Sequence, residues 1–241
     1  MQGNDLQLTW LGHSTFRIES PGGKTLLIDP WVMNNPACPE SEKKLKKLDV
    51  MLVTHGHFDH AGDAVAIARQ FNPTVVAIFE LCAWLEKKGV KQCSAMNKGG
   101  TQTVAGIKVT MTNAVHSSGI VDGDQMVYAG EACGFVIELE NGLKIYHSGD
   151  TAAFSDMNII REVYQPQVAI IPIGSHFIMS PREAACAVKM LRPKVVIPMH
   201  YGTFPVLSGT PAEFRELIKG TGAELLELKP GESASGKQLG A

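Results

Sequence analysis

Four side chains that can bind a metal ion lie within six consecutive positions, in the segment Thr54-His55-Gly56-His57-Phe58-Asp59-His60. An open catalytic zinc site takes only three protein ligands and leaves one position for water or substrate. Three imidazoles and a carboxylate in one short segment therefore indicate two neighbouring metal ions that divide the set. A polar loop with histidines placed by chance does not account for this density in a chain with only eight histidines.

The elements on either side of this segment explain how it could be positioned. The apolar run at 50–53 predicts a buried strand, and residues 61–71 show a helical pattern. The four ligand residues therefore belong to a loop between a strand and a helix. Such loops commonly carry chemistry because the elements beside them form a rigid scaffold.

Three later residues follow predicted strands in the same way. His116 comes after the apolar segment 107–114, Asp150 after 143–147 and His200 after 195–198. Taken alone, each histidine is explained by a surface or hydrogen-bonded role, and an aspartate beside glycine is a common turn residue. The repeated position directly after a strand favours one shared site at one end of the sheets.

The order of these residues resembles the metallo-β-lactamase superfamily, and more narrowly a branch of metal-dependent hydrolases near the ascorbate-phosphate lactonase-like proteins. The segments 10–14, 172–174 and 199–205 support the resemblance, which covers roughly residues 5–229. It implies an enzyme of class α/β (α+β), built as a four-layer αββα sandwich with the metals at one edge. Ser148 and the segment 175–178 differ from the residues that are commoner in this family at those positions. These differences bear on substrate specificity and not on metal binding.

The resemblance also implies how the ligands are divided. It assigns His55, His57 and His116 to one ion. It assigns Asp59, His60 and His200 to the other, with Asp150 bridging the two. Zinc suits this imidazole-rich set best, and the carboxylates also admit Mn²⁺ or Fe²⁺.

Two such ions lower the pKa of a water molecule to about 7 and supply hydroxide at neutral pH. We therefore expect a hydrolase that uses hydroxide bound by two metal ions to cleave a small ester, lactone or phosphoester. The alternatives are a phosphodiesterase or nuclease, a lipid phosphodiesterase on the same fold, and a non-catalytic metal-binding sensor. The complete ligand set argues against the sensor.

Catalytic and supporting roles are expected for residues both inside and outside the ligand set. Asp59 and Asp150 are expected to take part in catalysis, and His176 is expected to donate a proton to the departing oxygen. The remaining candidates, which would support the ligands or contact substrate, are His13, Asp29, His147 and Tyr201.

Composition limits the partners and the domain organisation. The 241 residues carry a net charge of −2, so the composition gives no basic surface for binding a nucleic acid or an anionic membrane. We therefore expect neither as a partner, and we expect a small-molecule substrate. Five scattered cysteines fit reduced thiols and a cytoplasmic location. We expect one domain over residues 1–230 and a disordered Gly/Ser-rich tail at 231–241. Assembly into a homo-oligomer is left open.

Overall fold

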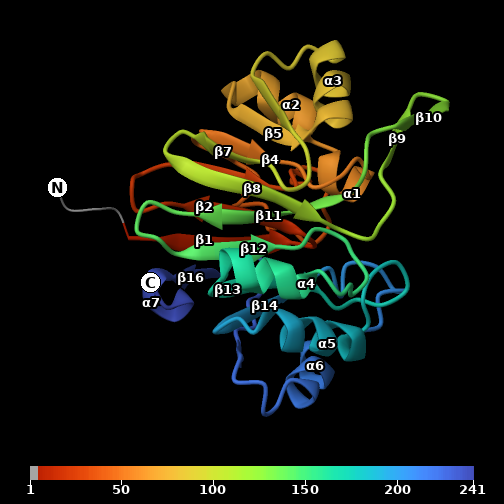
Figure 1. Cartoon of the computed structure of the whole chain (residues 1–241). Coiled ribbons are helices and arrows are strands. Elements are labelled where there is room, and N and C mark those ends of the chain that lie inside the picture. The colour runs from red at the N-terminus through yellow and green to blue at the C-terminus, as the bar shows by residue number, and fades with distance from the viewer. Residues whose placement is uncertain (1–4) are drawn as a thin grey trace.

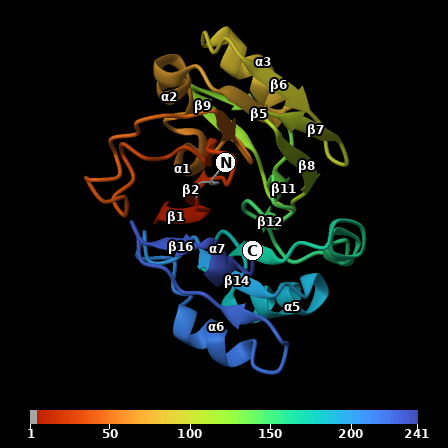
Figure 2. The same cartoon turned by 90° about the vertical axis from the view of Figure 1, so that its left-hand side faces the viewer.

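Two seven-stranded sheets pack face to face, and helices cover both outer faces (Figures 1 and 2). This computed structural model describes residues 5–241. The arrangement confirms the expected αββα sandwich. No helix in the described part of the chain is long and apolar enough to cross a membrane.

The first sheet is formed by the N-terminal part of the chain together with its last strand. Its order is β16 (Ser233–Ser235), β1 (Gln7–Gly12), β2 (Thr15–Glu19), β3 (Thr25–Ile28), β4 (Val50–Leu52), β5 (Thr74–Ile78) and β6 (Cys93–Met96). Strands β3 to β6 run parallel to one another, so their carboxyl ends share one edge of the sheet.

The second sheet contains the later strands. Its order is β15 (Glu224–Leu225), β14 (Val195–Met199), β13 (Val168–Pro172), β12 (Lys144–His147), β11 (Cys133–Glu138), β8 (Ile107–Asn113) and β7 (Thr101–Val104). Strands β12 to β15 are parallel. A separate two-stranded hairpin, β9 (Gly119–Asp122) and β10 (Gln125–Tyr128), projects from the body of the molecule (Figure 1).

The helices form the two outer layers. The first sheet is accompanied by α1 (Phe58–Ala61), α2 (Ala64–Phe71) and α3 (Phe79–Lys87). The second is covered by α4 (Met157–Ile159), a π-helical turn η1 (Ile160–Tyr164), α5 (Pro181–Leu191) and α6 (Pro211–Leu217). Ser180 and Thr210 cap α5 and α6 by accepting hydrogen bonds from backbone N–H groups three residues later, and proline begins each helix.

Strand β13 shows how the layers are held together. Val168 and Ile170 belong to the core between the two sheets, whereas Ala169 and Ile171 pack with α5 on the other face. Since successive side chains of a strand point to opposite faces, a strand buried on both sides is apolar throughout. The continuous apolar run 168–172 is therefore the signature of a central strand between two cores.

The predicted disorder of the tail at 231–241 is wrong. Strand β16 pairs antiparallel with β1, and α7 (Gly236–Leu239) follows it (Figure 2). Ala234 and Leu239 are fully buried. The Gly/Ser-rich composition indicated disorder, but the open edge of β1 offers backbone hydrogen bonds and the two apolar side chains reach the core.

The buried side chain of Leu239 gives a direct test of this ordered tail. We expect Leu239→Ala to lower the free energy of unfolding by about 2 kcal/mol, at the lower end for a buried leucine. Lys237→Ala in the same short helix removes an exposed side chain and should change stability little. Denaturant unfolding of both variants is the measurement, and equal stability would show that the tail does not contribute to the core.

Candidate metal centre

The candidate site lies where strands of both sheets end. Each of six residues follows directly or closely the carboxyl end of a strand: His13 after β1, Asp29 after β3, His55 after β4, His116 after β8, Asp150 after β12 and His200 after β14. The two sheets thus deliver these side chains to one edge of the sandwich. All seven predicted metal ligands meet there.

The side chains form three overlapping groups, in each of which the ligand atoms lie within 4.8 Å of one another. The groups are His55, His57 and His116; His13, Asp59, His60 and His200; and His55, His60 and Asp150. The first two correspond to the two halves of the predicted ligand set, with His13 as an additional member of the second. The third group links the halves.

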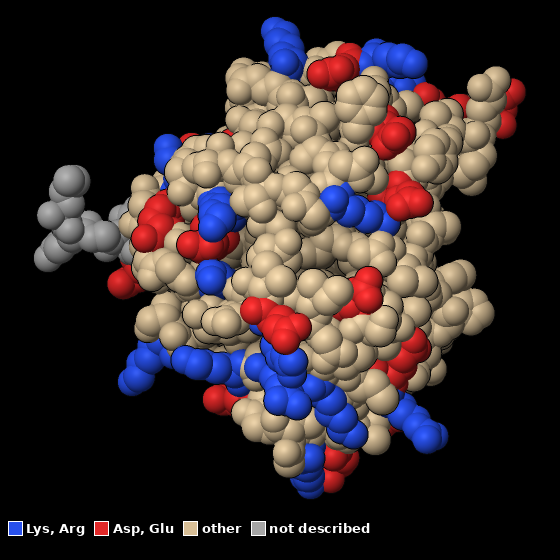
Figure 3. Space-filling view, viewed as in Figure 1, with Lys and Arg blue, Asp and Glu red and all other residues tan. Residues whose placement is uncertain are grey.

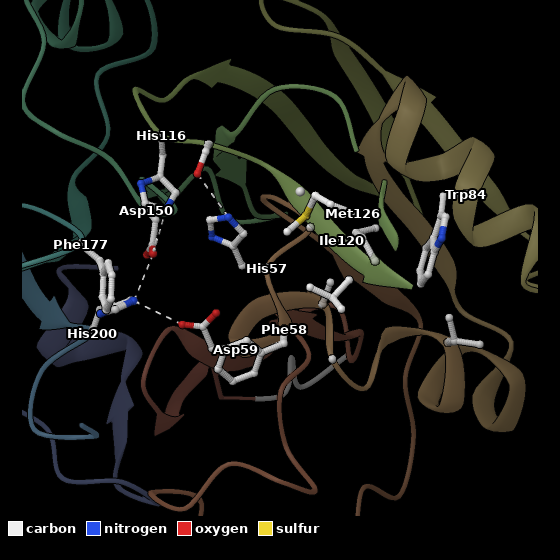
Figure 4. A pocket seen from close by; sticks show the side chains of 17 residues that line it. His57, Phe58, Asp59, Trp84, His116, Ile120, Met126, Asp150, Phe177 and His200 are labelled. Atoms are coloured by element: carbon white, nitrogen blue, oxygen red, sulfur yellow. Dashed lines mark hydrogen bonds and ion pairs between the residues drawn. The ribbon is translucent and has the colours of Figure 1, made fainter. Parts of the chain in front are cut away.

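Asp150 is at the centre of the cluster. Its Oδ2 atom lies 3.1 Å from Nε2 of His200 and 3.7 Å from Nε2 of His116 (Figure 4). The same oxygen lies 3.3 Å from Nε2 of His60. The carboxylate is almost completely buried. One oxygen atom therefore faces imidazoles from both halves of the set.

The same atoms show that the residues fit a metal ion. His60 Nε2, Asp150 Oδ1 and both ring nitrogens of His200 are buried and have no hydrogen-bond partner within residues 5–241. Buried polar atoms are normally paired, because leaving them unpaired costs free energy. A divalent cation would satisfy His60 Nε2, Asp150 Oδ1 and one ring nitrogen of His200, and imidazole with carboxylate is a donor set suited to zinc, manganese or iron.

Asp29 determines how two of the histidines present their nitrogens. Its Oδ1 accepts the backbone N–H of Thr54 at 2.8 Å, and its Oδ2 accepts the Thr54 hydroxyl at 2.8 Å and His60 Nδ1–H at 2.7 Å. Because the hydroxyl proton points to Asp29, the Thr54 oxygen accepts from Nδ1–H of His55 at 3.0 Å. Both imidazoles therefore turn Nε2 toward the cluster, as the nitrogen that can bind a metal ion when it carries no proton.

His147 supports the turn that carries Asp150. The backbone N–H of Gly149 donates to His147 Nδ1 at 3.2 Å, so the ring proton is on Nε2, which donates to the carbonyl of Ser14 at 3.1 Å. The ring is fully buried and does not line the cavity. These contacts support the expectation that His147 orients Asp150.

The backbone is strained at the site. His13, Asp29 and His200 have φ angles of +56°, +49° and +56°, in the left-handed region that residues other than glycine rarely adopt. The N–H of His200 donates to the carbonyl of His13 at 3.0 Å, which joins the two loops. Gly174 lies so close that a Cβ there would overlap the carbonyl oxygen of His200. Such strain persists only where the surrounding structure enforces it.

The pKa values of the buried histidines are shifted in opposite directions, depending on the carboxylates beside them. Burial lowers the pKa of His200, but the Asp150 carboxylate outweighs it and raises the pKa to about 9. Burial is likewise outweighed at His60, where Asp150 and Asp29 raise the pKa well above its usual value. Burial lowers the pKa of His13 to about 4 despite its hydrogen bond to Asp59. A metal ion must therefore displace protons from His60 and His200, and its binding strengthens as pH rises.

A cavity of about 580 Å³ opens beside the cluster (Figure 4). His57, Asp59, His116, Asp150 and His200 line one side of it. Its other side is formed by residues that sequence reasoning did not single out, notably Phe58, Trp84, Ile120 and Met126. Several of these come from the hairpin β9–β10. A signal for this hairpin existed in Asp122-Gly123, a dipeptide that favours tight turns between strands.

Two expected participants lie elsewhere. His176 is exposed and does not line the cavity; the N–H of Phe177 donates to the carbonyl of Ser175 at 2.7 Å, closing a γ-turn at His176 with a φ of +60°. This turn places Phe177, not His176, on the cavity wall, and this position does not support the proton-donating role expected for His176. Tyr201 packs against Trp10, with ring centroids 5.2 Å apart, and also lies outside the cavity.

The chain is similar to known proteins over most of its length. A family model described as a beta-lactamase superfamily domain matches residues 7–200. The chain is 60% identical over 230 residues to a UPF0173 metal-dependent hydrolase of Koribacter versatilis (strain Ellin345), covering 95% of this chain and 98% of that protein. A similar relative from Solibacter usitatus (strain Ellin6076) is 51% identical over 227 residues, covering 94% and 98%. The structure of Igni18, a metallo hydrolase from the archaeon Ignicoccus hospitalis, is 38% identical with a TM-score of 0.85, covering 96% and 98%.

Asp29 offers a test of the supporting hydrogen bonds. We expect Asp29→Asn to weaken zinc binding by about 10- to 100-fold, as is usual when a partner of a metal-binding histidine is lost. Competition with a chromophoric chelator measures the affinity. Asp49→Asn is the matched control, because Asp49 also accepts a backbone N–H, from Thr25. Asp49 precedes the first residue of β4, at the end of the strand opposite His55, and forms an ion pair with Lys47. Equal zinc affinity in the two variants would contradict the assigned role of Asp29.

Proposed function

Since the chain belongs to the β-lactamase superfamily and is a metal-dependent hydrolase, we propose that it holds two divalent cations and hydrolyses a small ester or lactone. The observation that carries this proposal is the central position of Asp150. Its Oδ2 contacts imidazoles of both ligand groups, as a bridging carboxylate requires.

The residues fall into two sets around that carboxylate. His55, His57 and His116 would hold one cation, and Asp59, His60 and His200 the other, with Asp150 shared. When bound, two divalent cations lower the pKa of a water molecule and polarise the bond to be broken. The predominance of imidazole among the ligands favours zinc.

The remaining polar groups orient this set. His13 has a lowered pKa and is neutral at pH 7, so one of its ring nitrogens carries the proton. Its Nε2 donates to Asp59 Oδ2 at 3.0 Å, while Nδ1 contacts the hydroxyl of Thr203 at 3.0 Å. Burial would raise the pKa of Asp59, but the hydrogen bond from His13 and the nearby imidazole of His200, whose Nε2 lies 3.7 Å from Oδ2, hold the pKa below its usual value. The ionised Asp59, at the cavity wall, accepts a hydrogen bond from the attacking water and orients it.

The surroundings favour an ester or lactone over a nucleic acid. The face in Figure 3 carries Lys and Arg interspersed with Asp and Glu. None of the described residues that line the cavity is Lys or Arg. A nucleic acid carries many phosphates beyond the one that reacts, and their binding depends on such cations. The cavity beside the ligands also favours an enzyme over a metal sensor, because a sensor needs no space for substrate.

The first test is metal stoichiometry. We expect protein purified without chelator and equilibrated with zinc to contain close to two ions per chain, because seven ligands exceed the need of one tetrahedral ion. Elemental analysis after gel filtration gives the number. A ratio that stays at one in excess zinc, and again in excess manganese, would count against the two-metal proposal.

The second test is the substitution Asp150→Asn, which keeps the shape of the side chain and removes its charge. We expect zinc content to fall and kcat/KM for p-nitrophenyl butyrate to drop by more than about 100-fold, beyond the loss caused by an outer hydrogen-bond partner. Asp156→Asn changes an exposed carboxylate and serves as the control. Full two-metal occupancy in Asp150→Asn would remove Asp150 from the bridging position.

A further inference from the structure

The part of the cavity that faces away from the metal ligands is apolar. Phe58 and Val65 come from the first sheet's helices, Trp84 from α3, and Ile120 and Met126 from the hairpin (Figure 4). Phe58 and Met126 are 65% and 71% exposed. Large apolar side chains gathered at the mouth of a cavity are a feature of ligand sites, since exposing them to water is otherwise unfavourable.

The hairpin that forms this wall is packed directly onto the ligand loop. A Cβ on Gly56, between His55 and His57, would lie 2.6 Å from Cγ1 of Ile120. The glycine thus allows Ile120 to approach the loop that carries the metal ligands. The apolar surface therefore begins beside the reacting centre and is continuous with it.

The tip of the hairpin is held against α3. Asp122 Oδ2 accepts the indole N–H of Trp84 at 3.0 Å, and its Oδ1 accepts the ammonium of Lys88 at 2.7 Å. These bonds fix the Trp84 ring as part of the cavity wall. They also engage the charge of Lys88 at the hairpin tip, and Lys88 does not line the cavity.

We propose that this apolar half of the cavity binds an uncharged, apolar arm of the substrate, such as a medium-length acyl chain. This inference rests on the proposed function and specifies its substrate class. Beyond the metal ligands, the wall offers aromatic and aliphatic surface, and among the described lining residues there is no cation to pair with an anion. A charged group at the end of the arm would lose its hydration without gaining a partner, which costs free energy.

Three esters with the same leaving group test the idea on the zinc-loaded protein. They are p-nitrophenyl acetate, p-nitrophenyl hexanoate and the mono-p-nitrophenyl ester of adipic acid, which has the length of the hexanoate and a terminal carboxylate. We expect kcat/KM to be about 250-fold higher for the hexanoate than for the acetate, from four added methylene groups at about fourfold each. The adipate ester should lose most of this gain.

A pair of valine variants links the effect to the cavity. Val121 lines the cavity and is 71% exposed, so Val121→Asp places a carboxylate on the wall without disturbing the core. Val163→Asp changes a valine that is 62% exposed on η1, away from this cavity. We expect Val121→Asp to lower kcat/KM for the hexanoate by about tenfold, with unchanged zinc content and melting temperature. Val163→Asp should match the wild type.

Binding without reaction separates this inference from the proposed function. Calorimetric titration with 4-phenyl-1-butanol, a neutral apolar probe, should show binding to the wild type and to Val163→Asp, and weaker binding to Val121→Asp. If no ester is hydrolysed but the probe binds in this way, the proposed function fails and the apolar site stands. If esters are hydrolysed but the hexanoate, acetate and adipate esters react equally and Val121→Asp has no effect, the apolar site is overturned.

Discussion

The structure depends on one buried carboxylate oxygen surrounded by imidazoles. Asp150 Oδ2 lies 3.1–3.7 Å from nitrogens of His60, His116 and His200, which follow strands or loops of both sheets. These contacts require β8, β12 and β14 to end at the same edge as β4, and therefore fix the alignment of the two sheets. The unpaired buried atoms around the oxygen then make a cation the simplest way to satisfy the site.

Much of this site could be predicted from sequence because its ligands are marked by local patterns. Four of them lie in one short segment, and the other three each follow an apolar strand. In an αββα sandwich, strand ends meet at one edge, so positions along the chain translate into proximity. His13 was harder to judge, since only the contact with Asp59, 46 positions away, shows that it joins the second group.

Other features depend on contacts that no local pattern reveals. The apolar cavity wall arises because the hairpin β9–β10 packs over Gly56 and is held to α3 by Asp122. Phe177 lines the cavity in place of His176 because His176 is the central residue of a γ-turn. No local sequence pattern predicts the positive φ angle of that turn. The helix predicted at 61–71 is divided into α1 and α2, which are separated by Gly62 and Asp63.

The pairing of β1 with β16 has a consequence for how the protein is made. Residues Thr9 and Ser233, whose hydroxyls are 2.8 Å apart, are separated by 224 positions. During synthesis on the ribosome, the edge of β1 stays uncovered until residues 233–235 have emerged. Until then the nascent protein presents an open strand, which is a surface for aggregation or for chaperones. Since β1 leads directly to His13, the final closure of this sheet also completes the support beneath the metal centre.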